Sequence, residues 1–547
     1  MTVAAPDYTA RILGTPNIPV TMDQDAGRIV FDSGKAPHVS ANGIRLALPD
    51  PDLLADLDPR DSRRLEITAG GRVFNLGIRR GAPDRGSAKV SLDLASDEAI
   101  LDDFAQLVDD DGAWPLQSSL RSVCDYVLGK IGTALEPGST DADATAYWEV
   151  TNLLANPSLE VDAANWIQVG GNPALARMAL SSAPAGAYVL RVTAAGVNAL
   201  VAPVAAPSDF SVVPGKEYTF NAHVITSGTG RMAEARLQWR NANGTVVVST
   251  VVGTPVATSS AGYVRPTISA VAPPGATHVL PYIAITGTVS GQIHFVDAAM
   301  FHEGDRAIPY HDGSIAPSGY TVSWQDVAHK SASTRTPLVE RRPEALRWPA
   351  GTSALAFLHP LVQAAGFRLV CNEAREWTLR DAAWREPGAQ TYRYGVNIIN
   401  GSEELTRDSE AWYDAAVFRY TWTDRDGITH TRDDTYALTP TPSKVILREI
   451  NAPYPGPGRA RYAVQRAQGK GRTVTATKQA TWTETAEQTF SAVLESTPLQ
   501  IGIAERVEFD LARNEVTATS RTTDTPAGAI ALLPGTINAL VGTINNL

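Results

Sequence analysis

Cysteine is scarce in this sequence: its 547 residues include only Cys124 and Cys371. Two thiols cannot form a disulfide framework or a four-cysteine zinc site. Each of them stands in an apolar pattern, which favours two buried free thiols over the alternative of a single bridge between them.

Long apolar runs and targeting signals are also missing. No stretch approaches the ~20 apolar residues that a membrane-spanning helix needs, so we expect no membrane span. The opening residues MTVAAPDYTARILG lack a basic start followed by an apolar run, so we expect no secretory signal.

Positive charge is in deficit. Lys and Arg total 47 against 58 Asp and Glu, which gives a formal net charge of −11. Phosphate backbones are bound by clustered Lys and Arg, so the balance argues against sequence-specific nucleic-acid binding. An acidic wall would instead let a polyanion pass without adhering. With 44% hydrophobic and 19% charged residues the chain is globular, and its length suggests three or four domains.

Catalytic motifs are absent too. There is no G-x-S-x-G elbow, no HExxH zinc motif and no recognisable Cys/His pair, and the nine histidines are scattered. The run DRDG at 424–427 lies between two strand-like segments and is read as a hairpin turn. We therefore expect a protein that is not an enzyme and has no catalytic residues.

Short β-rich runs separated by Gly, Pro, Asn and Asp make up most of the sequence, which predicts a mainly β, multidomain fold. Gly70-Gly71 and Arg513-Asn514 are predicted hairpin turns. Helical spacing of apolar residues predicts helices near 118–131 and 352–365, and Pro360 is expected to kink the second. A short C-terminal helix is predicted at 536–547, ordered by docking against a partner.

Two loop-like seams, at 136–145 and 310–319, enclose a region of short strands without an amphipathic helix. Its length suits one β-sandwich. The sequence thus predicts an N-terminal part (1–148), an inserted jelly roll (149–312) and a C-terminal part (313–547). We expect β-barrel segments in the first part and at about 400–525.

Several stretches resemble known phage proteins. NLLANPSLEVDAANW (152–166) resembles the opening of carbohydrate-binding jelly rolls. With HFVDAAMFHEGDRAIPYHDGS downstream, it is similar to the jelly-roll inserts of minor tail proteins from phages of actinobacteria. The flanks, LRSVCDYVLGKIGTALEPGSTDADATAYWEVTN and LRWPAGTSALAFLHPLVQAAGFRLVCNEAREWTL, resemble the tail-tip hub (baseplate) proteins of long-tailed phages.

This resemblance implies a structural virion protein at the tail tip, assembled in the host cytoplasm. It would form a homotrimer on the tail axis and close the tail tube. Its implied partners are the distal tail protein ring, the C-terminus of the tape measure protein, other minor tail proteins or fibres, and a host cell-wall glycan bound by the jelly roll during host attachment.

Jelly rolls of this type often hold a structural Ca²⁺ ion through a Glu in the opening motif and an Asp in the last strand. The matching residues are Glu160 and Asp297, and backbone carbonyls of residues 156–159 could complete the oxygen ligands. The alternative is that both carboxylates only accept backbone hydrogen bonds.

Strand parity selects the candidate carbohydrate-binding residues. In ARLQWRN the alternation places Leu237 and Trp239 in the core and their neighbours outside. The same reasoning applied to YTFNAHV and VLPYIAI leaves the outward candidates His223, Gln238, Arg240 and Tyr282. The alternative for each of them is an ordinary solvated sheet face.

One rival function stays open. A cell-wall-degrading glycoside hydrolase that carries a carbohydrate-binding module would need a pair of carboxylates, and carboxylates are plentiful here. A bacterial surface adhesin is disfavoured by the missing secretion signal and anchor.

Overall fold

A computed structural model describes residues 8–23, 27–47, 53–241, 244–406, 412–424, 426–467, 472–497 and 499–522. Within these ranges the protein is mainly β, as predicted, with a few short helices. The chain divides into two compact units. The first comprises Met1–Ala146, Arg341–Trp422 and Thr429–Leu547, and the second comprises Tyr147–Glu340 and Thr423–Ile428.

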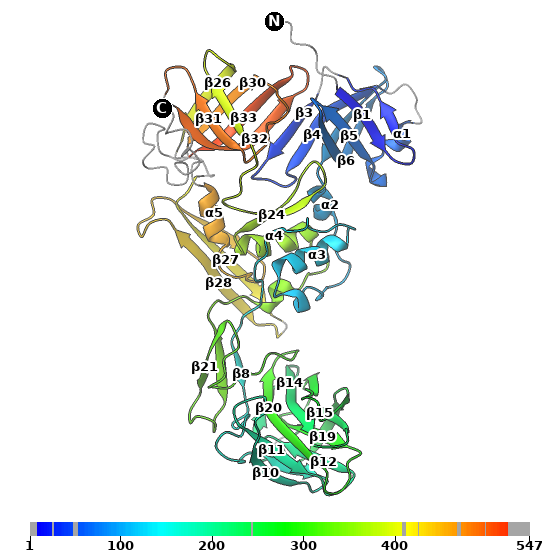
Figure 1. The fold of residues 1–547 in the computed structure, drawn as a ribbon, viewed down its shortest axis with the longest axis vertical. Coiled ribbons are helices and arrows are strands. Elements are labelled where there is room, and N and C mark those ends of the chain that lie inside the picture. The colour runs from blue at the N-terminus through cyan, green and yellow to red at the C-terminus, as the bar shows by residue number, and fades with distance from the viewer. Residues whose placement is uncertain are drawn as a thin grey trace. The chain divides into compact units, whose positions relative to one another are not determined.

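A large sheet of the first unit joins both ends of the chain (Figure 1). Its pairing order is β2-β1-β5-β6-β7-β4-β3-β32-β33-β30-β26, with β31 and β25 attached beside β32. The N-terminal strands are β1 (Tyr8–Leu13), β2 (Ile18–Val20), β3 (Arg28–Asp32), β4 (Val39–Ala47), β5 (Arg64–Ala69), β6 (Arg72–Asp84) and β7 (Lys89–Ala95). The C-terminal strands are β25 (Ala389–Arg393), β26 (Ile398–Leu405), β30 (Arg472–Gln479), β31 (Thr489–Val493), β32 (Gln500–Asp510) and β33 (Glu515–Thr522).

The expected β-barrels are not closed by a continuous strand ladder, because the pairing order of the described strands is an open path. In the N-terminal half, the isolated antiparallel bridge Met22–Leu46 links the segment after β2 back to β4. The two halves are joined by the antiparallel pair β3–β32, in which Phe31 lies opposite Val507. Alternating side chains from both halves form one core, where Trp482 stacks on Phe509 at 4.6 Å between ring centroids.

Hairpins and helices of the first unit largely follow the sequence signals. Gly70-Gly71 and Asn514 take positive φ at the β5–β6 and β32–β33 turns, as predicted. The predicted helices are α3 (Leu120–Gly129), capped by Ser119, and α4 (Ala354–Ala364), capped by Ser353 and continuing through Pro360. A hairpin of β23 (Phe367–Cys371) with β24 (Trp377–Asp381) follows α4.

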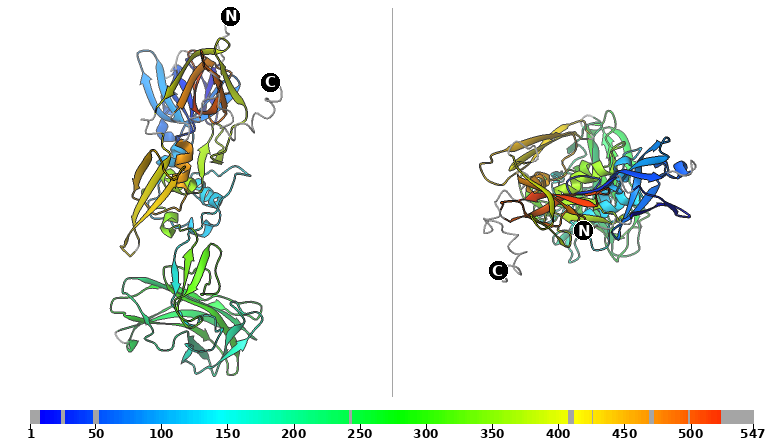
Figure 2. Two further views of the ribbon diagram at one scale, coloured as in Figure 1. Left: turned by 90° about the vertical axis from the view of Figure 1, so that its left-hand side faces the viewer. Right: turned by 90° about the horizontal axis from the view of Figure 1, so that it is seen from above.

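Smaller elements complete this unit. The helix α5 (Arg459–Ala467) packs on a three-stranded sheet in the order β28-β27-β29, as two views show (Figures 1 and 2). These strands are β27 (Ala415–Thr423), β28 (Thr429–Ala437) and β29 (Val445–Ile450). The DRDG stretch joins β27 to β28, as predicted. The remaining helices are α1 (Leu53–Asp56) and α2 (Glu98–Asp103), with 3-10 turns at Pro59–Asp61, Trp114–Leu116 and Pro343–Leu346.

The second unit contains a β-sandwich. One sheet has the order β10-β11-β20-β14-β18, and the other has the order β16-β15-β19-β12-β9, with β13 on β19 and β17 on β15. The first sheet comprises β10 (Ala174–Ala179), β11 (Tyr188–Thr193), β20 (Ile293–Glu303), β14 (Glu217–Thr226) and β18 (Thr267–Val271). The second comprises β16 (Val247–Val252), β15 (Met232–Arg240), β19 (His278–Thr286), β12 (Asn198–Ala202), β9 (Ile167–Gly170), β13 (Phe210–Ser211) and β17 (Val256–Ala257).

Alternate side chains of the two sheets fill the core of this sandwich. Phe220 and Phe301 come from one sheet, while Leu237, Trp239 and Ile283 come from the other. This is the parity predicted from the sequence, and Trp239 is fully buried. The described residues of 147–340 contain no α-helix, in agreement with the sequence.

The chain enters and leaves the second unit on neighbouring strands. β8 (Val150–Asn152) pairs with β22 (Ser333–Pro337), which forms a hairpin with β21 (Tyr320–Trp324). The unit therefore continues past residue 312, where the sequence placed the end of the insert. Whether 1–148, 149–312 and 313–547 fold as separate domains stays a prediction.

Three smaller expectations also meet the structure. Cys124 and Cys371 are both buried free thiols, as favoured. No helix in the described ranges has the length and apolar character of a membrane span. The predicted helix at 536–547 lies outside the described residues.

Candidate functional site

Two of the predicted sugar-binding residues share a polar row on the outer face of β15. Arg240 donates to Gln238 Oε1 at 2.5 Å and to the carbonyl of Gly244 at 2.8 Å. Gln238 Nε2 also lies 3.5 Å from Thr250 Oγ1 on β16. Both side chains are partly exposed, so this face offers amide and guanidinium groups to a ligand.

Tyr282 lies on the same face but is covered. It stands opposite Arg236 in the β15–β19 register, and the guanidinium carbon of Arg236 is 5.9 Å from the ring centroid. Ala202, Val204 and neighbouring apolar side chains pack around the ring. Only 6% of Tyr282 is exposed, so its ring face is not open for stacking on a pyranose. Strand parity correctly placed Tyr282 on the outer face of the sheet. The chain around Ala202 and Val204 packs over that face and covers the ring.

His223 belongs to the other sheet of the sandwich. It lies on β14 opposite Asp297 of β20, beside a register shift of this pair. Burial and the charge of Arg265 lower the pKa of His223, so its imidazole is neutral near pH 7. The four predicted residues therefore do not form one site: three lie on the β15–β19 sheet and one on the β14–β20 sheet.

Asp297 is the most perturbed carboxyl of the sandwich. It is fully buried, its Oδ2 accepts from the amide of Ala185 at 3.0 Å, and its Oδ1 has no hydrogen-bond partner among the described residues. Burial, helped by the charges of Glu160 and Asp312, raises the pKa of Asp297 to about 8. The two predicted metal ligands are thus electrostatic neighbours.

Glu160 is held by the backbone. Its Oε1 accepts from the amides of Ala187 and Tyr188, each at 3.0 Å. A Cβ at Gly186 would lie 2.3 Å from the Glu160 carboxyl carbon, and Gly186 has φ of 70°, so a side chain there would displace Glu160 and strain the backbone. Both predicted ligands thus accept backbone hydrogen bonds, as the alternative reading proposed.

The backbone carbonyls expected to join a calcium site are also engaged. The carbonyl of Asn156 accepts from Trp166 Nε1 at 2.9 Å, and that of Leu159 accepts from Arg177 Nε at 2.6 Å. A carbonyl oxygen has two lone pairs, so each retains one. Oxygen donors of this kind suit Ca²⁺. However, within the described ranges no three His, Cys, Asp or Glu residues lie close enough to share an ion.

Sequence reasoning missed the residues that surround Asp297 and His223. Asp312 accepts from Tyr310 Oη at 2.9 Å, and Arg265 Nε donates to Asn221 Oδ1 at 2.9 Å. The Pro-Tyr-x-Asp-Gly motif contains Asp312, so a signal for this residue was present. Arg265 follows a short irregular segment and carries no motif.

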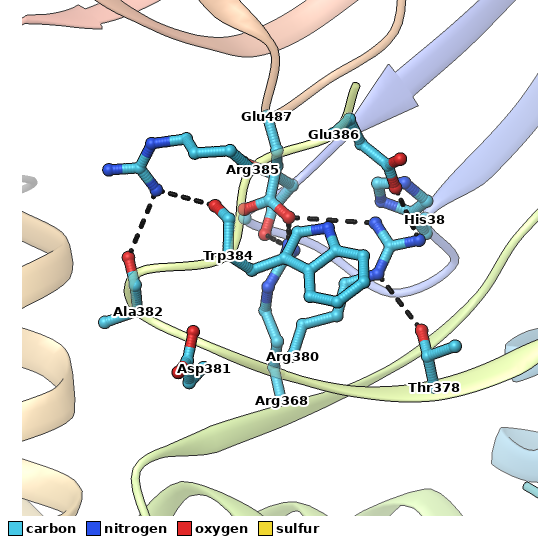
Figure 3. Close-up of polar contacts among 12 residues, drawn as sticks. His38, Arg368, Thr378, Arg380, Asp381, Ala382, Trp384, Arg385, Glu386 and Glu487 are labelled. Carbon is cyan, nitrogen blue, oxygen red and sulfur yellow. Dashed lines mark hydrogen bonds and ion pairs between the residues drawn. The ribbon is translucent and has the colours of Figure 1, made fainter. Parts of the chain in front are cut away.

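A second polar cluster lies inside the first unit and was not signalled by the sequence (Figure 3). The Glu487 carboxylate forms ion pairs with Arg368 of β23 and with Arg380 of β24, the latter at 3.7 Å. It also pairs with Arg466 of α5 at 3.7 Å. These four side chains are at most about one-tenth exposed. Arg380 also pairs with Glu386 at 2.7 Å. We call Arg368, Arg380, Arg466 and Glu487 together the arginine cluster.

The backbone fixes part of this cluster. The carbonyl of Ser33, in the β3–β4 turn, accepts from Arg368 Nη1 at 2.7 Å and from Arg466 Nη2 at 2.8 Å. Glu487 itself has φ of 72°, a left-handed conformation that costs a non-glycine residue roughly 1–3 kcal/mol. Residues more than 100 positions apart in sequence meet here, which is why no local pattern predicted the cluster.

Comparison with known proteins gives only weak structural likenesses. No protein-family model and no curated protein matches the chain. Among solved structures, the chain is similar to the N-terminal family 22 carbohydrate-binding and catalytic modules of Clostridium thermocellum xylanase 10B (14% identity, 27% of this chain and 28% of that chain, TM-score 0.23). It is also similar to the C-terminal family 22 carbohydrate-binding module of the same enzyme (18% identity, 29% and 98%, TM-score 0.23).

A viral protein is among these likenesses. The enzymatically active domain of tailspike protein 4 from bacteriophage CBA120 matches at 10% identity over 28% of this chain and 21% of that chain, with a TM-score of 0.22. The chain therefore spans about a quarter of the two longer proteins. Identities and TM-scores this low do not establish a function.

Proposed function

We propose that this chain is a structural protein of a phage tail tip, a hub that displays a glycan-binding jelly roll for host attachment. The resemblance of the sequence to tail-tip hub and minor tail proteins suggests the hub. One structural observation carries the display role: the second unit is entered and left on adjacent antiparallel strands.

The β8–β22 pair explains why that observation matters. Thr334 of β22 stands opposite Thr151 of β8, and their hydroxyls are 2.9 Å apart. An inserted domain needs neighbouring ends, because the host fold must close around it. A host body can thus carry this sandwich without disturbing its own core.

The glycan site is proposed on the polar row of β15. Gln238 and Arg240 offer hydrogen-bond donors and an acceptor for sugar hydroxyls, and both lie on β15, which is paired on both sides by β16 and β19. Because Tyr282 is covered, binding there would depend on hydrogen bonds more than on stacking. His223 defines a competing site on the other sheet.

A glycan array with the full chain tests this proposal. Gln238→Ala with Arg240→Ala should abolish binding, while Gln325→Ala, an exposed change on the β21–β22 hairpin, should leave it intact. Loss of binding in His223→Ala alone would move the site to the β14–β20 sheet. The glycan-binding role fails if the unaltered protein binds no host cell-wall glycan.

A structural calcium ion is proposed as a further part of the jelly roll. Asp297 Oδ1 and the free oxygen of Glu160 would hold it, and the ion would stabilise the ionised form of Asp297. The support is the buried, unpartnered Oδ1 of Asp297. Calcium should then raise the melting temperature of the protein. Asp297→Asn should remove that effect, and an equal shift with magnesium would contradict a calcium site.

The hub role is tested on virions. We propose a homotrimer on the tail axis that contacts the distal tail ring, the tape measure C-terminus and other minor tail proteins. Quantitative mass spectrometry of purified particles should give three copies, and crosslinks should join the chain to those partners. A single copy would contradict the trimer. A clearing zone on a host cell-wall zymogram would replace the proposal of a non-enzymatic protein by the hydrolase alternative.

A further inference from the structure

The outer face of β15 carries one ion pair and one unpaired cation. Arg236 Nε and Nη2 donate to Glu234 Oε2 at 2.9 Å and 2.6 Å, so these two charges neutralise each other. Arg240 instead donates to two neutral oxygens, Gln238 Oε1 and the carbonyl of Gly244. Among the described residues no carboxylate forms an ion pair with its guanidinium. The polar row therefore ends in a positive charge without a counter-ion.

The acidic residue of the adjoining loop does not supply this counter-ion. Asp209 follows Ser208, and a Cβ at Gly244 would lie 2.9 Å from the Cα of Ser208, so the loop passes close to the end of the polar row. Asp209 Oδ2 accepts from two backbone amides of its own loop, at 2.6 Å and 2.8 Å. Its carboxylate is thus committed to the loop and forms no ion pair with Arg240.

A second nitrogen base stands beside Arg240. His278 of β19 is the direct partner of Arg240 in the antiparallel β15–β19 register. Directly opposed side chains share a face of the sheet, with their Cβ atoms about 5 Å apart. Thr277 Oγ1 lies 3.0 Å from His278 Nδ1, which leaves Nε2 for a ligand. Both side chains are partly exposed, so a guanidinium and an imidazole are offered together.

The Arg240 guanidinium is already oriented. Its Nη1 and Nη2 are held by the carbonyl of Gly244 and by Gln238 Oε1, while its Nε is buried. A guanidinium has more N–H donors than these bonds use, so the remaining Nη donors can meet a ligand. A side chain that is ordered before binding loses less conformational entropy when the ligand arrives. Arg240 is therefore a pre-formed anchor.

The charge of this anchor distinguishes between classes of glycan. Hydroxyl groups of a neutral sugar accept hydrogen bonds from a guanidinium but leave its charge without a partner. A carboxylate or a phosphodiester supplies acceptors and charge together, which gives a stronger hydrogen bond. The chain as a whole carries a net charge of −11, so a polyanion gains nothing from general attraction. Preference for an anion would therefore arise at this local position.

We propose that the glycan bound on the polar row is anionic, and that Arg240 and His278 hold its carboxylate or phosphodiester group. This inference rests on the proposed glycan-binding function and names the class of glycan. Uronic-acid polymers and phosphodiester-linked polymers share the required chemistry, an oxyanion repeated along a hydroxyl-rich chain. Gln238 and Thr250, which neighbour each other across β15 and β16, would contact the hydroxyl groups.

Binding of the full chain to paired oligomers tests this inference, by biolayer interferometry at constant ionic strength. The probes are oligomers of galacturonic acid and of glucuronic acid, each beside its carboxyl-reduced neutral counterpart, and an oligomer of glycerol phosphate. We expect at least one acidic probe to bind about tenfold tighter than the neutral oligomers, a gain that one charge-assisted hydrogen bond can supply. Tighter binding of the uronates identifies a carboxylate ligand, and tighter binding of glycerol phosphate identifies a phosphodiester.

Variants locate the anion. Arg240→Gln should reduce the preference for the acidic probe to about threefold or less, whereas Arg240→Lys, which keeps the charge but not the planar fork, should retain part of it. Arg419→Gln removes an exposed arginine of β27 that is paired with Asp433. It is the charge-matched control and should keep the full preference. If Arg240→Gln does not fold, His278→Ala is the second variant and should lower the preference several-fold.

Three results would overturn the inference. Equal binding of acidic and neutral oligomers would reject the anionic class and leave the glycan-binding role standing. An unchanged preference in folded Arg240→Gln would mean that the anion is held elsewhere. Binding of none of the oligomers would also reject the anionic class, and the glycan array described above would decide separately whether the protein binds any glycan.

Discussion

Replacing Asp297 by Asn should stabilise the jelly roll at neutral pH in the absence of calcium. Burial of this carboxyl raises its pKa to about 8 from an ordinary value of 3.8. In the unfolded chain the group is ionised above pH 4, whereas in the folded protein it keeps its proton up to about pH 8. The folded state therefore holds one proton more than the unfolded state across this window.

The sign and size of the effect follow from proton linkage. Because the folded state binds the extra proton, the free energy of unfolding falls as pH rises, by ~1.4 kcal/mol per pH unit. Three pH units, from 4 to 7, correspond to ~4 kcal/mol. The decline levels off above pH 8, where both states are ionised. Asn cannot ionise and can still accept from the amide of Ala185, so we expect a gain of ~1–4 kcal/mol at pH 7.

Hydrogen exchange followed by mass spectrometry measures the stability of the sandwich within the full chain. In the presence of a chelator, the opening free energy of peptides from β14 and β20 should decline between pH 5 and pH 8 in the unaltered protein. It should decline less steeply in Asp297→Asn. Peptides from β23 and β24 of the first unit serve as the internal control, since they should respond equally in both proteins.

The reasoning would be refuted by equal pH slopes for the two proteins, because Asp297 would then be ionised in the folded state. Calcium gives an independent check. A bound ion requires the ionised carboxylate, so calcium should stabilise the unaltered protein more as pH rises and should have no such effect on Asp297→Asn.

Three further results are expected. Glu487→Gln should lower the free energy of unfolding by ~3–5 kcal/mol, because it leaves Arg368 buried without its carboxylate. Chemical denaturation monitored on the first unit measures this loss. An unchanged midpoint would mean that the cluster is hydrated. Trp239→Ala should lower the free energy of unfolding by ~3–5 kcal/mol, because it opens a cavity in the sandwich core. Val247→Ala on the exposed edge strand should lower it by less than ~0.5 kcal/mol. Thermal unfolding measures both, and similar losses would place Trp239 outside the core. Residues 147–340 expressed alone should unfold cooperatively, and an unfolded product would mean that the sandwich needs its host.

Local pattern was enough to predict much of the fold. Alternation in ARLQWRN identified Trp239 as core and Gln238 as outward, because neighbouring side chains of a strand point to opposite faces. Helical spacing of apolar residues located α3 and α4, because the residues that share one helix face lie only three or four positions apart. Paired glycines at residues 70 and 71 located a hairpin for the same reason.

Only the tertiary structure decided which of those surfaces remain open. Parity placed Tyr282 on the outer face, but apolar side chains around Ala202 and Val204 cover it. His223 and Gln238 were grouped by chemistry, yet they lie on different sheets. The union of N-terminal and C-terminal strands in one large sheet likewise depends on the long-range pair β3–β32.

The arginine cluster marks the limit of sequence reasoning most clearly. Arg368, Arg466 and Glu487 each look like an ordinary surface charge in their own segment. They become a buried ionic group only because β23, α5 and the segment before β31 converge on the carbonyl of Ser33. The sequence by itself determined the periodicity of each element, since periodicity is a property of neighbours. Burial, charge pairing and pKa depend on atoms brought together from distant positions, and the folded chain alone decided these.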